Sequence, residues 1–328
     1  MALIFDKVIM KLNEYIIQRL KQIKTIYVHN TKTPSELSNE IYTSLLSHKF
    51  RKYWANNSLR EHCKKAIDIC ISQNQPIAVT FLQGAYKLRR LEESPEVDRA
   101  ELFSTIYYSE RLRHICEIYE PWVWFDFFVD DNIIPILNNV STDDIETYIH
   151  SFQQLLNFLR DYQPDNMKMT ITRVGDQFTS PQEFEKVITL QREKIIQNKP
   201  VFSQERLAMV ELNAKPSEQQ VQNPYRREDI LITHDAYLIA KKATGYHFKD
   251  DKILAFPQKL SSGTVIALGT TKHSIVKSRI GIGALQKKWD SYNEYILSPK
   301  QIETYHPTKE RITIEWLRGK NFTHINIF

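Results

Sequence analysis

Two short apolar runs separated by a helical pattern mark the centre of the chain. They cover residues 76–83 and 122–129, and between them apolar residues recur at helical spacing over residues 102–118. Two strands joined by a helix form a βαβ-like unit. In open α/β sheets, ligands bind beyond the carboxyl ends of the strands. We therefore predict that the functional site lies at the two strand exits, within residues 76–139.

Helical patterns surround this unit. Ser94-Pro95 predicts the start of the helix that joins the two runs, and Ser141 predicts the cap of a helix that runs to about Tyr162. Capping boxes predict three more helix starts, at residues 33–36, 58–61 and 180–183. An amphipathic helix is predicted over residues 6–27, with an apolar face made of Val8, Leu12, Tyr15, Ile16, Leu20 and Ile23.

Strand patterns are concentrated in the last part of the chain. Alternation predicts a half-buried strand at residues 167–173, and further strands are predicted at residues 264–268, 311–317 and 322–328. Residues 203–243 are mostly helical in pattern, with a polar insert at residues 215–223 that we predict to be a mobile loop. These elements predict an α/β fold, a Rossmann-like mixed sheet of roughly five or six strands flanked by helices.

The order of the patterns also predicts three parts. They are an N-terminal helical scaffold over residues 1–75, an α/β core over 76–244, and a smaller β-rich C-terminal part over 245–328 that completes the site.

Composition narrows the class of protein. The 328 residues are 42% hydrophobic and 25% charged, which is ordinary for a globular chain. The net charge of +5, from 44 basic and 39 acidic residues, is too small and too scattered to indicate a surface that coats nucleic acid. Three cysteines lack metal-ligand spacing, and the sequence pattern leads us to expect neither a signal peptide nor a membrane-spanning segment. We expect a reduced, cytoplasmic protein.

A cationic loop follows the first apolar run. Gly84 opens it, and Tyr86, Lys87, Arg89 and Arg90 follow within a few positions. Arginine can bind a phosphate or carboxylate as a fork, and lysine can bind it as a point charge or form an imine with a carbonyl group. The loop is therefore a candidate substrate cradle. The alternative is a solvated loop that happens to be basic.

Carboxylates follow both strands. Asp98 and Glu101 lie in the first turn of the joining helix, where an acidic residue can simply complement the helix dipole. Asp130 and Asp131 end the second run and are candidates for general acid–base chemistry, although a turn would also use aspartate there. The sequence contains no P-loop, GxGxxG or HExxH motif, so it gives little support for a nucleotide or metal site.

A second cationic loop runs from Gly269 to Arg279. It contains Lys272, His273 and Lys277, with hydroxyl residues between them. A strand that leads through glycine into hydroxyl and lysine residues suits anion binding through backbone N–H groups. A solvated basic hairpin is the alternative. Two separate cationic loops would suit the two ends of a phosphosugar, or two substrates.

The order of features over residues 76–139 resembles the isocyanide (isonitrile) synthases of the pyoverdine/dityrosine biosynthesis family. That family shows a strand entering a Lys-containing loop, a Pro-x-x-Asp-x-Ala-Glu helix start, a Tyr-x-Pro-Gly turn and a strand ending in Ser/Asp-Asp. The corresponding residues here are Gly84-Ala-Tyr-Lys87, Pro95-Glu-Val-Asp98-Arg-Ala-Glu101, Tyr119-Glu-Pro121-Trp122 and Asp130-Asp131. Arg99 stands where the family usually has Trp, and Trp122 stands where it usually has Gly.

The resemblance implies an enzyme that joins the α-amine of an amino acid, aromatic in the family, to the C2 carbonyl of ribulose 5-phosphate. C2 becomes the isocyanide carbon and the rest of the sugar is eliminated, with no metal or organic cofactor. The implied partners are these small molecules, not nucleic acid or a membrane. An iron/2-oxoglutarate oxygenase is implied as the next enzyme of the same secondary-metabolite pathway.

This chemistry needs acid–base groups and a site for a phosphate dianion. The catalytic candidates are Lys87, Glu101, Asp130, Asp131 and His273. The substrate-binding candidates are Tyr86, Arg89, Arg90, Asp98, Arg99, Lys272, Lys277 and Arg279. An alternative function is a non-catalytic protein that binds RNA or a phosphate ligand through the two basic loops, with affinity that falls steeply with salt. A third hypothesis is that the protein is a scaffold whose N-terminal helices dock a partner.

Overall fold

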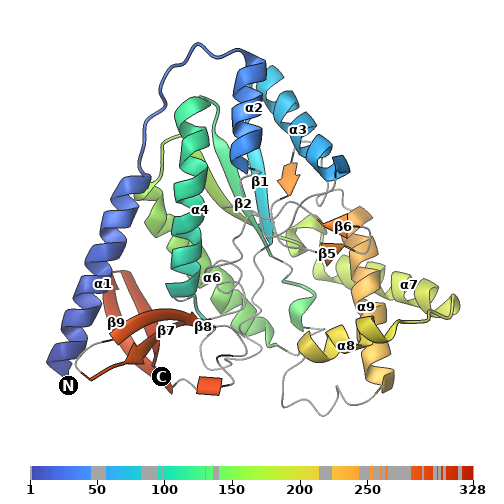
Figure 1. The fold of residues 1–328 in the computed structure, drawn as a ribbon. Helices are drawn as coiled ribbons and strands as arrows, with labels where there is room; N and C mark the ends of the chain where they lie inside the picture. The colour runs from blue at the N-terminus through green and yellow to red at the C-terminus, as the bar shows by residue number, and fades with distance from the viewer. Residues whose placement is uncertain are drawn as a thin grey trace.

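The computed structural model describes most of the chain, with gaps. The described residues are 2–45, 57–82, 95–97, 99–129, 131–135, 140–213, 224–243, 252–254, 259–260, 263–264, 282–289, 292–297, 301, 304–305, 308–316 and 320–327. The chain begins with three helices, α1 (Ala2–Ile23), α2 (Pro34–Leu45) and α3 (Asn57–Ser72). Figure 1 shows α1 on one side of the molecule and the α2–α3 pair at the top.

A parallel sheet follows these helices. Its strands are β1 (Ile77–Leu82), β2 (Val123–Val129), β3 (Met167–Arg173) and the short β4 (Lys252–Leu254), in the order β3-β2-β1-β4. Helix α4 (Arg99–Ile118) joins β1 to β2, and α6 (Thr142–Leu159) joins β2 to β3. The predicted βαβ unit and the α/β class are therefore confirmed.

An aromatic cluster fixes α4 and α6 on one face of this sheet. Phe125 and Phe127 project from the same face of β2, since their positions differ by two, and their ring centroids are 4.5 Å apart. Phe125 contacts Tyr108 of α4 at 5.0 Å, and Phe127 contacts Phe152 of α6 at 4.9 Å, edge to face. All four rings are buried. The two helices and β2 therefore form one core.

The second half of the chain adds helices and another sheet. Helices α7 (Pro181–Gln197), α8 (Gln204–Asn213) and α9 (Pro224–Ala243) lie together on the side away from α1 (Figure 1). Strands β7 (Ile282–Lys287), β8 (Tyr292–Leu297), β9 (Thr308–Trp316) and β10 (Lys320–Ile327) form a sheet in the order β8-β7-β10-β9. Leu285 of β7 is fully buried in the main core. Strands β5 (Lys259–Leu260) and β6 (Gly263–Thr264) form a two-stranded antiparallel pair.

Local sequence signals placed several helix ends correctly. The backbone N–H of Glu36 donates to Thr33 Oγ1 (3.3 Å), and Glu36 Oε2 accepts from the Thr33 N–H (2.8 Å), so this capping box is reciprocal. Ser141 and Ser180 accept from backbone N–H groups at the starts of α6 and α7. Asn57 begins α3, one residue before the predicted capping box.

Two predictions about helices are wrong. The joining helix begins at Arg99 and not at Ser94-Pro95, because the chain at residues 95–97 is irregular. Val97 is buried there and its N–H donates to Ser151 Oγ of α6 (3.1 Å), which holds the segment against another helix. Tyr15 is half exposed and does not belong to the apolar face of α1, whereas Ile16, Leu20 and Ile23 are buried as predicted.

Strand predictions had mixed outcomes. The strands expected at residues 167–173, 311–317 and 322–328 correspond to β3, β9 and β10. Only the first residue of the strand expected at 264–268 is described, and the insert 215–223 lies outside the described residues. Strands β7 and β8 were not predicted, because their short segments mix polar and apolar residues without clear alternation. The division into three parts stays a prediction, and β4 joins the central sheet beside β1.

The three cysteines are free and buried. Burial raises the pKa of Cys63 and of Cys116 to about 12, so both are held as neutral thiols in the folded chain. Cys63 and Cys70 are seven positions apart in α3 and share its buried side. Among the described residues, no helix is long and apolar enough to span a bilayer.

Candidate functional site

The carboxyl ends of β2 and β3 meet at one edge of the parallel sheet. The backbone N–H of Val174 donates to the Val129 carbonyl (3.0 Å), so the two strands leave the sheet side by side. Gly175 follows at once, and a Cβ atom there would lie 2.7 Å from Asn132 Oδ1. This separation is shorter than any ordinary contact, so glycine is what lets the two turns approach each other. The exit of β2 is thereby fixed against the exit of β3.

Asp131 is the centre of a charged cluster at this edge. Arg173 Nε donates to Asp131 Oδ2 (2.7 Å), and the Gly175 N–H donates to Asp131 Oδ1 (3.3 Å). Arg173 also donates through Nη1 to Glu146 Oε2 of α6 (2.9 Å), and through Nη2 to the other oxygen of the same carboxylate. We call Asp131, Glu146, Arg173 and Gly175 the strand-exit cluster. It brings β2, β3 and the first turns of α6 together through one guanidinium group.

Burial and charge act in opposite directions on Asp131. Its side chain is only 2% exposed, and burial raises the pKa of the carboxyl group, while the Arg173 charge and the Gly175 N–H partly offset the rise. Arg173 divides its charge between two carboxylates, so it does not fully compensate the buried one. The pKa of Arg173 is raised by Glu146 and Asp131 together. The pKa of Asp131 is therefore higher than that of an exposed aspartate, which suits a group that transfers protons.

Glu101 belongs to a second buried pair near the same edge. It lies in the first turn of α4, is 1% exposed and accepts a hydrogen bond from the Tyr148 hydroxyl of α6 (3.2 Å). Tyr148 follows Glu146 by two residues, so α6 contacts Glu101 directly and reaches Asp131 only through the Glu146–Arg173 pair. The alternative was that Glu101 only complements the helix dipole. An exposed carboxylate would be enough for that role, so it does not explain why Glu101 is buried. Arg99, two residues before Glu101, is also buried.

The structure describes three of the thirteen predicted site residues. Arg99, Glu101 and Asp131 are described. The remaining candidates lie outside the described residues, namely Tyr86, Lys87, Arg89, Arg90, Asp98, Asp130, Lys272, His273, Lys277 and Arg279. That the two cationic loops approach the strand exits therefore stays a prediction.

The Tyr119-Glu-Pro121-Trp122 turn lies at the other end of β2. The hydrogen bonds of this turn connect separate segments of the chain. The Tyr119 hydroxyl donates to the carbonyl groups of Gln75 (2.6 Å) and Cys70 (3.0 Å), and Asn166 Nδ2 donates to the Tyr119 carbonyl (3.0 Å). The turn therefore ties α3, α4 and the approach to β3 together at the amino edge of the sheet, away from the strand-exit cluster.

A further buried carboxylate, Asp126, lies inside β2. Its Oδ1 accepts hydrogen bonds from the hydroxyl groups of Thr170 (2.8 Å) and Thr172 (2.7 Å) on the neighbouring strand β3. Trp124 Nε1 donates to Thr170 Oγ1 (2.6 Å). The face of the sheet opposite the aromatic cluster therefore carries polar side chains, and Asp126 is held there by strand-to-strand bonds.

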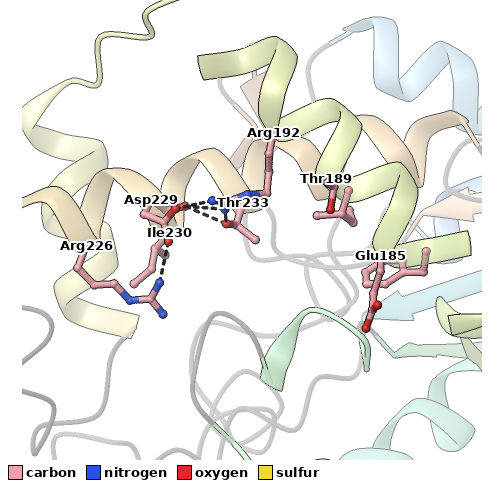
Figure 2. Close-up of a pocket in the computed structure, with 9 residues that line it drawn as sticks. Glu185, Thr189, Arg192, Arg226, Asp229, Ile230 and Thr233 are labelled. Atoms are coloured by element: carbon pink, nitrogen blue, oxygen red, sulfur yellow. Dashed lines mark hydrogen bonds and ion pairs between the residues drawn. The ribbon is translucent and has the colours of Figure 1, made fainter. Parts of the chain in front are cut away.

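A pocket lies between α7 and α9 (Figure 2). Its volume is about 370 Å³, and its lining combines apolar residues with an arginine–aspartate cluster. Arg192 Nη2 and Arg226 Nη1 donate to the two oxygens of Asp229, at 2.5 and 2.7 Å. The lining residues are Phe184, Glu185, Ile188, Thr189, Arg192, Arg226, Asp229, Ile230 and Thr233.

The sequence analysis did not identify several polar residues of the strand-exit cluster and of the α7–α9 pocket. Arg173 could have been found, since it ends a predicted strand of a parallel sheet, where site residues collect. Glu146 and Tyr148 stand on a helix pattern and carry no motif. The residues of the α7–α9 pocket are far apart in sequence, and nothing in the pattern indicates which helix faces which. Among the described residues, no group of three or more His, Cys, Asp or Glu side chains is arranged to hold a metal ion.

The fold is similar to that of a known protein. The PvcA protein from Pseudomonas aeruginosa aligns with a TM-score of 0.56 over 88% of this chain and 99% of its own, at 13% sequence identity. At this identity the likeness shows a shared fold. The sequence matches no model of a protein family and no curated protein.

Proposed function

We propose that this chain, which has the fold of PvcA, is an isocyanide synthase-like enzyme of secondary-metabolite biosynthesis. The observation that carries the proposal is the agreement of two independent likenesses. The motifs of residues 76–139 resemble the isocyanide synthase family, and the fold likeness is to a protein of that family and extends over nearly the whole of both chains. The strand order β3-β2-β1-β4, with β4 added on the far side of β1, supports a Rossmann-like arrangement.

The proposed substrates are an amino acid and ribulose 5-phosphate. The amine condenses with the C2 carbonyl and releases water. The C1–C2 and C2–C3 bonds then break, so that C2 is retained as the isocyanide carbon while C1 and the phosphate-bearing C3–C5 fragment leave. Such a sequence needs groups that move protons at the imine and at the sugar carbons. Asp131, with its raised pKa, and Glu101, hydrogen-bonded to Tyr148, are the described residues suited to these steps. Arg173 acts as a positioning residue, because its fork fixes the orientation of the Asp131 carboxylate.

The direct test is to incubate the purified protein with ribulose 5-phosphate and each of the twenty amino acids, and to trap isocyanide with a tetrazine. We expect a product with at least one amino acid, and Arg99, buried in place of the usual Trp, makes a full panel necessary. An active enzyme of the isocyanide synthase family serves as the positive control. Silence with every amino acid while the control reacts would contradict the proposed reaction.

Lys87 is the predicted residue that tests the first cationic loop. A lysine that binds the phosphate or forms the imine contributes charge and nucleophilicity that alanine lacks. We expect Lys87→Ala to lower kcat/KM at least about a hundredfold, in the range of a lost catalytic group. A Lys87→Ala enzyme with full activity would remove the loop from the site and leave the proposed reaction intact.

A further inference from the structure

The α7–α9 pocket is separate from the groups that the proposed reaction uses. Its residues come from one face of each helix. Positions 185, 188, 189 and 192 of α7, and positions 226, 229, 230 and 233 of α9, follow helical spacing. Phe184, early in α7, contacts Tyr237 late in α9, with ring centroids 6.3 Å apart, whereas Arg192, late in α7, pairs with Asp229 in the first half of α9. The two helices are therefore antiparallel, and the pocket runs along them.

Charge is distributed unevenly along this pocket. At one end two guanidinium groups share the single carboxylate of Asp229, which leaves one positive charge in excess. Glu185 lies at the other end, as Figure 2 shows. Glu185 and Arg192 are seven positions apart, which is about 10 Å along a helix. The acidic group is therefore too distant to neutralise the arginine end.

The two arginines differ in what remains available to a ligand. Arg192 is held at both terminal nitrogens, since Nη1 contacts Thr233 Oγ1 and the Asp229 carbonyl, and Nη2 donates to the Asp229 carboxylate. Among the described residues, Arg226 has one partner, Asp229 Oδ2. Its side chain is 36% exposed and lines the pocket at the end opposite Glu185 (Figure 2). Nε and Nη2 of Arg226 form the side of the fork that a bidentate anion would use.

The helix dipole adds to this positive end. Arg226 lies in the first turn of α9, a helix of 20 residues, and no acidic residue stands in that turn. The amino end of a helix carries a partial positive charge, so an anion beside Arg226 gains from both the guanidinium group and the helix.

The remaining walls are apolar. Phe184, Ile188 and Ile230 are each less than 10% exposed and form the floor between the helices. A volume of about 370 Å³ with an apolar floor and a few convergent polar groups lies within the usual range of small-molecule sites, roughly 300–1,000 Å³. A second hollow between α2 and α3 differs from this pocket. It is lined by Lys, Arg, Glu and Asp side chains, and Tyr42 is its single aromatic residue among those described.

We propose that the α7–α9 pocket binds a small carboxylic acid with an apolar body. The carboxylate lies on Arg226 at the amino end of α9, and the apolar body covers Phe184, Ile188 and Ile230. Both an α-amino acid and a simple carboxylic acid share this chemistry. The proposal does not depend on isocyanide formation, because binding is measured without ribulose 5-phosphate.

The test uses two probes, L-phenylalanine and 3-phenylpropionate, titrated into the full-length protein by calorimetry. We expect at least one probe to bind, and Arg226→Gln to weaken that binding about tenfold to a hundredfold, as for the loss of a charge-assisted pair. Arg226→Lys keeps the charge without the fork and should show an intermediate loss. Binding of L-phenylalanine alone would show that the ammonium group is also recognised, and binding of both would show that the carboxylate suffices.

Arg206→Gln is the matched control. Arg206 lies in α8 and pairs with Asp235 of α9 (2.6 Å). Its side chain is about as exposed as that of Arg226, but it does not line the pocket. We expect this variant to bind as the unaltered protein does, and thermal unfolding checks that each variant is folded. The proposal is overturned if neither probe binds with a Kd below about 1 mM, or if Arg226→Gln binds as tightly as the control variant.

Discussion

Replacing Asp131 with asparagine is expected to lower kcat/KM for isocyanide formation by about a hundredfold to ten-thousandfold. This is the range of general acid–base catalysis, and asparagine cannot exchange the proton. The variant should remain folded, because the asparagine oxygen still accepts from Arg173 and because Arg173 keeps its bonds to Glu146. The measurement is the rate of isocyanide formation by tetrazine trapping, with circular dichroism as the check on folding.

The pH dependence of the rate gives the same prediction a second readout. As a general base Asp131 must be ionised, so kcat/KM falls as the pH falls through its pKa. Because burial raises that pKa, the acid limb should lie at a higher pH than an ordinary aspartate would give. The residual activity of Asp131→Asn should lack this limb. An unchanged acid limb in the variant would assign the titration to another group.

Asp126→Asn is the control for Asp131. It is also a buried carboxylate of β2, but it lies inside the strand and accepts from Thr170 and Thr172. An asparagine oxygen can accept the same two bonds. We therefore expect this variant to keep activity within about a few-fold, as for a substitution without a catalytic role. Equal losses in both variants would indicate that any buried change in β2 disturbs the site, and would contradict a specific role for Asp131.

Phe127→Ala should have the largest effect on stability. The ring is 1% exposed and lies between Phe125 and Phe152, so its removal leaves a cavity where β2 contacts α6. We expect the free energy of unfolding, from urea denaturation, to fall by about 3–5 kcal/mol. The same packing sets the position of β2, which leads to Asp131, relative to α6, which carries Glu146.

Trp289→Ala is the corresponding control on the surface. Trp289 is a larger aromatic residue but is fully exposed beyond β7. Its replacement should change the free energy of unfolding by less than about 0.5 kcal/mol. A loss from Phe127→Ala as small as this would show that the aromatic cluster does not hold β2 on α6.

The sequence was sufficient for the frame of the fold. Two apolar runs around a helical pattern predicted β1, α4 and β2, because a strand covered on both faces is apolar along nearly its whole length, and Asp126 is the one charged residue within β2. Caps at Ser141 and Ser180 predicted α6 and α7, since a side-chain oxygen must satisfy the first N–H groups. The start of α4 was misplaced because Val97 is held by Ser151, a contact between distant segments that no local signal contains.

Strand direction was enough to predict only part of the candidate site. Parallel strands deliver their carboxyl ends to one edge, which was enough to name Asp130 and Asp131 as candidates, and the structure describes Asp131 at that edge. Its partners Arg173 and Glu146, and the shift in its pKa, depend on which elements pack together. The same limit explains the α7–α9 pocket, where Arg192 and Arg226 are brought to one carboxylate by the antiparallel packing of two helices.

The measurement that tests the proposed function most directly follows the carbon atom. The purified protein is incubated with ribulose 5-phosphate labelled with carbon-13 at C2 and with the amino acid that reacts in the panel, and the trapped product is analysed by mass spectrometry and NMR. We predict that the label is retained at the isocyanide carbon, and that Asp131→Asn forms little of this product. Isocyanide formed without the label, or no isocyanide from any amino acid, would contradict an isocyanide synthase that takes its carbon from the pentulose phosphate.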